Sequence, residues 1–497
     1  MSTTATIARG STTRAGGRRG RRGWPALWLL AVLVAGAVTV VQTEPAARRL
    51  VLPVAVMASL AVLHVTVLWR RDGEVPVFEI GTLWMASALL YSAVPFVNFV
   101  MNGLQWASNA DGRLMGYPFD LDAVAAFAWR YVVYLGSFVV VYLPVRARAT
   151  AAGAPLDPVP RSWIVGLVTL LALQWAFERL VYVVYGVTLH YAYSDIAAMS
   201  QVPEMPYVLL QVTFIVLAGA LVIKQGLLLL LIRRWGDLRW RLLLVTWLGF
   251  EVVSVVMQMG ARGGAVRLLL SLAVLYHRFV RPWRPFWLVV AGSVFLVAFL
   301  AQGVLRFRQD VDGGALLAGT NEFQAVFATA YDLYRRQLDG TLPPIPWQIY
   351  VSELYLFIPS QLLPFQKWDP ADWYLEVIGI RGIGVGFMFG VMSQAVIGLD
   401  WIELAGRGAL LGLVLALFHR WYVRRARRFW PTLLYLFVVI WSYYTMRATT
   451  FYLVHYVLYQ FVPVMALTML VSLAWRRRRA RPSAAQPRTA SIDLRTP

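Results

Sequence analysis

Long apolar runs separated by short polar segments dominate the hydrophobic pattern of this 497-residue chain. Most runs are roughly 18 to 23 residues long, the length that an α-helix needs to cross the hydrocarbon core of a bilayer. They lack the alternation of apolar and polar positions, over about ten residues, that is typical of a membrane β-barrel. The pattern therefore predicts an all-α polytopic membrane protein with about twelve transmembrane helices, over residues 24–41, 50–69, 80–100, 124–143, 163–185, 207–231, 242–259, 265–276, 286–303, 405–418, 431–445 and 456–475.

One polar segment, residues 304–404, is far longer than the others. Within it, residues 323–338 have apolar positions at helical spacing, whereas the Gly-rich apolar stretch 383–398 is too short for a span. We therefore expect short helices and a reentrant segment there. The expected organisation is a basic tail (1–23), a membrane domain of about nine spans (24–303), the large loop (304–404), three last spans (405–475) and a second basic tail (476–497).

Composition supports the same class of protein. Hydrophobic residues make up 59% of the chain and charged residues only 14%, with a mean hydropathy of +0.61, which excludes a soluble domain. The chain has no cysteine, which excludes a disulfide framework, an iron–sulfur cluster or a thiolate zinc site.

The positive charge predicts how the chain is oriented. Much of the formal charge of +21 lies in the two tails, and further arginines lie in alternate loops between the predicted spans. Because Lys and Arg near span ends are retained in the cytoplasm, we expect both termini inside and the loop 304–404 outside. Basic runs that abut apolar spans favour contact with anionic lipid headgroups over nucleic acid. The abundance of Arg, Ala, Val and Leu indicates a GC-rich bacterial genome, so the expected location is the bacterial cytoplasmic (inner) membrane.

A Gly-rich turn is the first candidate binding site. Arg262 lies in this turn, GARGG, between the seventh and eighth predicted spans, and Arg267 follows about one helical turn later. Backbone N–H groups at a helix start, together with two guanidinium groups, suit a pyrophosphate. The alternative is a flexible hairpin whose arginines reach lipid headgroups.

Four further arginines lie on the predicted outer side. Arg306 and Arg308 follow the ninth span, Arg381 precedes the reentrant segment, and Arg447 interrupts the apolar hairpin YYTMRATTFY. An arginine between two spans is costly unless it is paired or faces a cavity. Arg447 is therefore the strongest single candidate for substrate binding.

The candidate general bases are carboxylates within spans and histidines on the outer side. Glu178, next to Arg179, lies in the fifth predicted span, Glu251 lies in the seventh, and His190 and His455 lie outside. We nominate Glu178 and His455 as candidate catalytic residues. An ion pair is the alternative role for the glutamate, and simple packing is the alternative for the histidine.

Motifs for metals and nucleotides are absent from the sequence. The carboxylate pairs in FDLD and DVD are short patterns that arise readily by chance, and no Walker loop, dinucleotide fingerprint or HExxH is present. We therefore expect neither a metal nor another cofactor, and no ATP-driven transport by this chain alone.

Several segments together resemble the Wzy-type oligosaccharide repeat-unit polymerases, the family that makes O-antigen and exopolysaccharide. They are the turn and helix GARGGAVRLLLSL, the loop stretch LFIPSQLLPFQK, the segment IGVGF with Ser393 after it, and the hairpin MRATTFY. The resemblance covers residues 260–452. One position departs from the family pattern, because Gln394 stands where an acidic residue is expected and Glu403 comes only later.

This resemblance implies a GT-C-like polymerase that joins repeat units carried on undecaprenyl pyrophosphate, without metal or nucleotide sugar, at the outer face of the membrane. The chemistry agrees, because fixed guanidinium groups stabilise a departing pyrophosphate. The residues expected to do so are Arg262, Arg267, Arg306, Arg308, Arg381 and Arg447. The implied partners are the lipid-linked glycan, membrane lipids, a chain-length regulator and a flippase.

Three alternatives stay open. A transporter of an anionic or lipid-linked substrate should show two similar six-span halves, and the sequence shows no such repeat. A GT-C glycosyltransferase that uses lipid-phosphate sugars usually has carboxylates in its first outer loop, where this chain has only Glu44. An O-antigen ligase would displace the same leaving group as a polymerase.

Overall fold

The computed structural model describes most of the chain between residues 48 and 480. The described residues are 48–73, 76–102, 108–109, 113–114, 117–118, 120–148, 156–185, 207–257, 262–283, 287, 290, 321–358, 362–365, 367–379 and 388–480.

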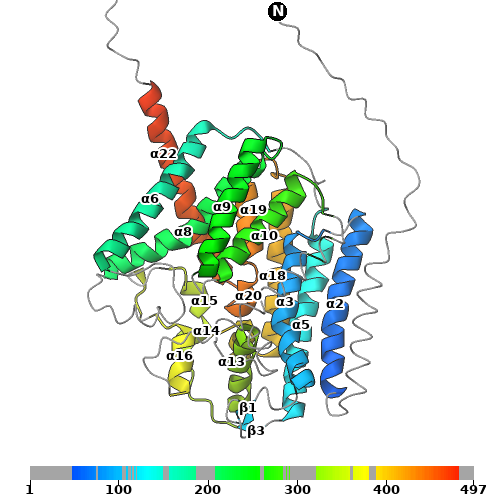
Figure 1. Ribbon diagram of the computed structural model, residues 1–497. Helices are drawn as coiled ribbons and strands as arrows, with labels where there is room; N and C mark the ends of the chain where they lie inside the picture. Colours follow the sequence, from blue (N-terminus) through cyan, green and yellow to red (C-terminus); the bar gives the residue numbers. More distant parts are fainter. Residues whose placement is uncertain are drawn as a thin grey trace, which may run out of the picture.

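Four long helices form one side of a bundle: α2 (Arg48–Asp72), α3 (Ile80–Asn102), α5 (Leu121–Val145) and α18 (Trp401–Val423). They run side by side in Figure 1. Glycines allow α18 to approach α5 closely, since a Cβ added to Gly412 would lie only 3.3 Å from the Cα of Phe138. We call the end of the bundle that carries Arg146, just after α5, the Arg146 end, and the opposite end the Asp120 end.

The other side of the bundle consists of α6 (Arg161–Tyr185), α8 (Tyr207–Ile232), α9 (Leu238–Met257), α10 (Arg262–Phe279), α19 (Phe429–Trp441) and α22 (Val462–Ala480). Here too a glycine permits close packing, because a Cβ on Gly166 of α6 would meet Thr468 of α22 at 2.9 Å. α19 has 13 residues and is about 20 Å long. It therefore ends within the bundle, and Figure 1 shows α20 (Tyr444–Arg447) near mid-height.

The long loop folds against the Asp120 half of the bundle. Its helices are α13 (Asn321–Leu338), α14 (Trp347–Tyr350), α15 (Ser352–Tyr355), α16 (Pro370–Val377) and α17 (Val391–Ile397). α13 packs an aromatic face on α3 and α5, where the Phe327 ring lies 5.3 Å from Phe96 and 5.6 Å from Phe127. Nearby, β1 (Ser108–Asn109), β2 (Arg113–Leu114) and β3 (Tyr117–Pro118) form a small antiparallel sheet.

After α20 the chain turns back towards the Arg146 end. It does so through α21 (Tyr452–Tyr456) and the π-helix η3 (Val457–Phe461), which continue directly into α22. We call residues 442–452, which join α19 to α21, the hairpin. Three separate parts of the fold surround it, namely α3, α15 and α18.

The predicted fold class is confirmed in its coarser form. The described part of the chain is helical apart from the small sheet, and four of its helices are long and apolar enough to cross a membrane: Arg49–Asp72, Leu121–Val145, Trp401–Val423 and Tyr452–Arg477. Shorter apolar helices occur at Ile80–Phe96, Arg161–Phe177, Gly219–Ile232 and Phe429–Trp441. These features indicate a helical membrane protein.

Most of the twelve predicted spans overlap a helix. The span 24–41 lies outside the described residues, as does nearly all of 286–303. The span 431–445 differs, because the helix begins at Phe429 and ends at Trp441. Of the predicted reentrant segment only residues 388–398 are described, and they include the short, fully buried helix α17.

Candidate functional site

An aromatic cluster surrounds the point where α19 ends. Trp441 lies 4.9 Å from Tyr444 and 4.1 Å from Tyr456, measured between ring centroids. Tyr444 and Tyr456 are themselves 4.9 Å apart, and Tyr452 stands 5.1 Å from Tyr456. We call Trp441, Tyr444, Tyr452 and Tyr456 the hairpin aromatic cluster. It joins the end of one apolar helix to the start of the next.

Two of the predicted substrate-binding arginines flank this cluster. The Arg267 guanidinium, from α10, lies 4.3 Å from the centre of the Trp441 ring, and the Arg447 guanidinium, from α20, lies 5.2 Å from the centre of Tyr444. Both are cation–π distances, and both arginines are half-buried. Because the two rings touch, residues 180 positions apart in the sequence are brought to one site.

His455, one of the two nominated bases, lies on another edge of the same cluster. Its ring stacks on Tyr459 with centroids 4.5 Å apart and lies 5.2 Å from Tyr452. The hydroxyl of Tyr459 donates to the carbonyl of Phe357 at 3.0 Å, which ties η3 to the turn after α15. The structure therefore brings Arg267, Arg447 and His455 around one group of aromatic rings.

A buried ionic cluster lies on the loop side of the hairpin. Arg407 of α18 binds two carboxylates, with its Nη1 2.5 Å from Glu353 and its Nη2 2.6 Å from Glu403. We call Glu353, Glu403 and Arg407 the Glu353 cluster. The Glu353 side chain is only 3% exposed, and this burial raises its pKa even though Arg407 acts in the opposite direction. A carboxylate with a raised pKa is a stronger base than usual.

The Glu353 cluster also holds the hairpin in place. The backbone N–H of Phe451 donates to Glu353 Oε2 at 3.4 Å, and Arg407 donates to the hydroxyl of Thr450 at 3.4 Å. From the other side, the indole N–H of Trp84 on α3 donates to Thr445 at 2.8 Å. The segment that carries Arg447 is therefore fixed by α3, α15 and α18 together.

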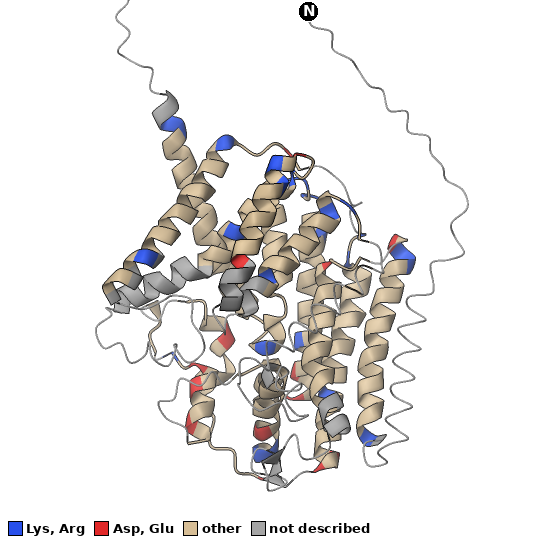
Figure 2. Ribbon diagram, viewed as in Figure 1, with Lys and Arg blue, Asp and Glu red and all other residues tan. Residues whose placement is uncertain are grey.

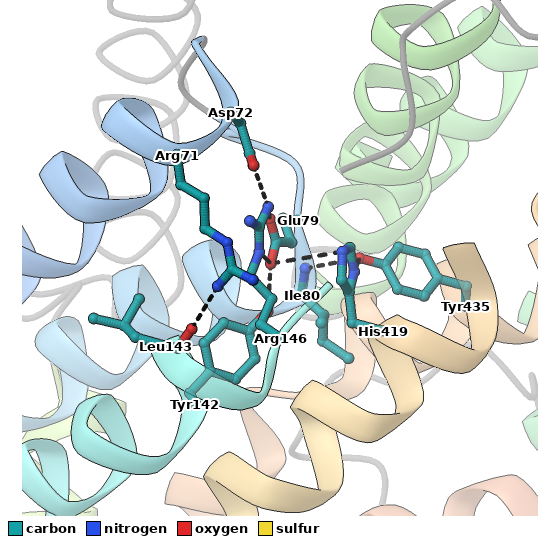
Figure 3. A network of polar contacts seen from close by, with 9 residues as sticks. All are labelled: Arg71, Asp72, Glu79, Ile80, Tyr142, Leu143, Arg146, His419 and Tyr435. Carbon is teal, nitrogen blue, oxygen red and sulfur yellow. Dashed lines mark hydrogen bonds and ion pairs between the residues drawn. The ribbon is translucent and has the colours of Figure 1, made fainter. Parts of the chain in front are cut away.

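A second buried ionic network lies at the Arg146 end (Figure 3). Arg146 is fully buried and binds Asp72 at 2.5 Å and Glu79 through its Nε at 2.6 Å. The hydroxyl of Tyr142 donates to the same Glu79 oxygen at 2.5 Å. One guanidinium is thus shared between two buried carboxylates, one at the end of α2 and the other just before α3.

This network continues into α18 and α19. His419 Nε2 lies 3.8 Å from Glu79, and its Nδ1 lies 2.9 Å from the hydroxyl of Tyr435, which also accepts from the backbone N–H of Ile80 at 3.0 Å. The network therefore connects α2, α3, α5, α18 and α19, as Figure 3 shows.

The remaining predicted site residues are not placed at the hairpin. Arg306, Arg308 and Arg381 lie outside the described residues. Arg262 begins α10 and Glu178 lies in α6, but the structure does not describe their side chains. The other acid considered as a base, Glu251, pairs with Lys224 of α8 at 2.6 Å, so it has an ionic role.

The sequence analysis did not single out Glu353 or Arg407. Glu353 looks like an ordinary loop acid in the sequence, and its burial results from contacts with residues 54 and 98 positions away. Among the described residues, no group of three or more histidine and acidic side chains could hold a metal ion. Comparison with protein-family models, curated proteins and solved structures found no match to this chain.

Proposed function

We propose that this protein polymerises undecaprenyl-pyrophosphate-linked oligosaccharide repeat units at the outer face of the bacterial cytoplasmic membrane. The single observation that carries the proposal is the meeting of Arg267 and Arg447 at one aromatic cluster within a bundle of apolar helices. A pyrophosphate leaving group needs fixed positive charge, and aromatic rings beside it offer surfaces on which sugars stack.

The distribution of charge supports the orientation. Figure 2 shows Lys and Arg at most helix ends at the top of the view, which is the Arg146 end of the bundle, as well as further down, whereas Asp and Glu lie mainly in the lower half. Retention of Lys and Arg in the cytoplasm then makes the Arg146 end cytoplasmic. The long loop and the hairpin accordingly face the outer half of the membrane, where a flipped lipid-linked glycan is presented.

The reaction needs three contributions from this chain. Arg267 and Arg447 stabilise the charge that develops on the pyrophosphate as its bond to the anomeric carbon breaks. The hairpin aromatic cluster packs against both arginines. A general base takes the proton of the attacking sugar hydroxyl, and His455 lies at the edge of the same cluster.

The test is a deletion strain complemented with defined variants. Its lipid-linked glycans are extracted and sized by mass spectrometry. We expect single undecaprenyl-linked repeats to accumulate in the deletion strain, and Arg447→Ala, expressed at the wild-type level, to leave them unpolymerised. The matched control is Arg425→Ala, because Arg425 makes a cation–π contact of the same 5.2 Å length with Trp421 at the Arg146 end. Normal polymer in the deletion strain, with no second polymerase present, contradicts the proposal.

Transport of a lipid-linked or anionic substrate is the second candidate function. The observation that favours it is the buried Asp72–Arg146–Glu79 network, because ionisable residues inside a membrane bundle often mark a transport path. The same strain separates the two functions. A transport defect leaves the repeat units on the cytoplasmic side, protected from a glycosidase added to spheroplasts, whereas a polymerase defect leaves them exposed outside.

A further inference from the structure

Buried polar groups without a partner occur on the segments next to the Glu353 cluster. Ser352 and Gln394 are at most 1% exposed, and Thr449 is 3% exposed. The hydroxyl oxygens of Ser352 and Thr449 and the amide oxygen of Gln394 have no hydrogen-bond partner among the described residues. Hydroxyl and amide oxygens of this kind can form hydrogen bonds with a sugar hydroxyl.

These groups belong to α15, α17 and the hairpin, the segments next to Glu353 and Arg407. Ser352 is its neighbour in α15, and Thr449 precedes Thr450, which accepts from Arg407. The amide nitrogen of Gln394 donates to the carbonyls of Ile349 and Tyr350, immediately before α15. The cluster thus lies where α15, α17, α18 and the hairpin meet.

The electrostatic balance leaves one carboxylate available to accept a proton. Arg407 carries one positive charge and faces two carboxylates. Glu403 has a second donor, because its Oε2 accepts from the backbone N–H of Leu399 at 2.9 Å. Among the described residues, Glu353 has, besides Arg407, only the longer 3.4 Å bond from Phe451. Burial raises the pKa of Glu353, which suits this carboxylate to accept a proton.

The cluster is also open on one edge. Arg407 and Glu403 are 14% and 18% exposed, although Glu353 behind them is almost fully buried. The hairpin connects this edge to the pyrophosphate site, since Phe451 follows Arg447 by four residues.

We propose that the Glu353 cluster binds the acceptor sugar and that Glu353, rather than His455, is the general base of the polymerase. This inference rests on the proposed function. In the step it describes, the acceptor hydroxyl oxygen bonds to the anomeric carbon of the donor and the bond from that carbon to the pyrophosphate breaks. The pyrophosphate departs on its undecaprenyl chain beside Arg267 and Arg447, and the hydroxyl proton passes to the carboxylate of Glu353.

The experiment uses the full chain in lipid nanodiscs, with undecaprenyl-linked repeat units isolated from the deletion strain as the probe. Initial rates are measured for the wild type and for Glu353→Gln, Glu353→Asp and His455→Gln from about pH 4 to 9. Glu376→Gln is the matched control, because Glu376 is an exposed acid of the same loop.

We expect Glu353→Gln to lower kcat by roughly 10²–10⁴-fold, the usual contribution of a general base, with little change in KM. Glu353→Asp should keep part of the activity and displace the rising limb of the pH–rate profile. If Glu353→Gln fails to fold, the activity and pH–rate profile of Glu353→Asp still test whether Glu353 is the general base.

Two results overturn the inference while leaving the proposed function intact. One is wild-type kcat in a folded Glu353→Gln protein. The other is a rising pH limb that is unchanged in Glu353→Asp but lost in His455→Gln. A wild-type protein that elongates no repeat at all removes the proposed function, and this inference with it.

Discussion

Arg130 and Asp400 join α5 to the start of α18 across 270 residues of sequence. The guanidinium binds both carboxylate oxygens, with distances of 2.8 Å from Nε and 2.6 Å from Nη2. The same guanidinium lies over the rings of Tyr334 and Trp401, at 4.3 and 4.6 Å. Asp400 has a φ of +48°, in the region that favours glycine, so the ion pair holds the junction between α17 and α18 in a strained conformation.

We therefore expect Asp400→Asn to lower the free energy of unfolding by about 3 kcal/mol, because Arg130 is left without its charge partner in a mostly buried position. Denaturant unfolding in detergent measures the change. The control is Asp122→Asn, which removes the carboxylate that pairs with Arg49 at an exposed site, where the expected loss is below about 1 kcal/mol. Equal losses in the two variants would show that the Arg130–Asp400 pair stabilises the fold no more than an exposed ion pair does.

The network at the Arg146 end gives a second prediction. Replacing Arg146 with Met leaves Asp72 and Glu79 buried without their cation, and should cost about 3–5 kcal/mol. Adding Asp72→Asn and Glu79→Gln to Arg146→Met removes the uncompensated charge and should recover much of the loss. The comparison is made by thermal unfolding of the single and triple variants. A triple variant no more stable than the single one would contradict this explanation.

Acid should weaken the Asp120 end of the bundle. The pKa of Asp120 is lowered, first by the backbone N–H of Ala123 and then by Arg335, because Asp120 caps α5 and pairs with α13. A carboxyl whose pKa is lower when folded adds stability above its unfolded value near 3.8, and this is lost as the pH falls through the folded value.

Thermal unfolding between about pH 6 and 2.5 tests this pH dependence. The wild type should lose stability below about pH 4, and Asp120→Asn should lose less over that range, although it starts less stable at pH 6. Asparagine is still a good N-cap, so the variant isolates the charge. Parallel pH curves for the two proteins would exclude Asp120 as a source of acid sensitivity.

The sequence predicts the helices well because a span needs only length and apolar composition, which are local properties. α5 and α18, for example, extend only a few residues beyond their predicted ranges 124–143 and 405–418. The depth of the hairpin was not predictable in the same way. After α19 ends at Trp441, the hairpin is bound by Trp84, Glu353 and Arg407, which come from distant parts of the chain.

The same contrast between local properties and long-range contacts applies to the site residues. Arg267 and Arg447 stand out in the sequence because an arginine is conspicuous among apolar neighbours, although only the fold shows that one aromatic cluster joins them. Glu353 does not stand out, because an acid in a polar loop is ordinary until other segments bury it. Glu251 stood out as an acid within a span, and the fold pairs it with Lys224.

A methyl group added at Gly390 should disturb the packing that positions the hairpin. A Cβ on Gly390, just before α17, would lie 2.6 Å from the carbonyl oxygen of Met446 and 3.0 Å from Val326. Neither the backbone of the hairpin nor α13 can move away freely, so Gly390→Ala should destabilise the protein by about 1–3 kcal/mol. Because the hairpin carries Arg447, polymer formation in the complemented deletion strain should also fall.

The matched control is Gly406→Ala in α18, where an added Cβ meets nothing within 4 Å. Alanine favours a helix over glycine, so this variant should be unchanged or up to about 1 kcal/mol more stable, with normal polymer. Thermal unfolding and glycan sizing of both variants give the comparison. If Gly390→Ala matched Gly406→Ala in both measurements, close packing of α17 against the hairpin would not be what positions Arg447.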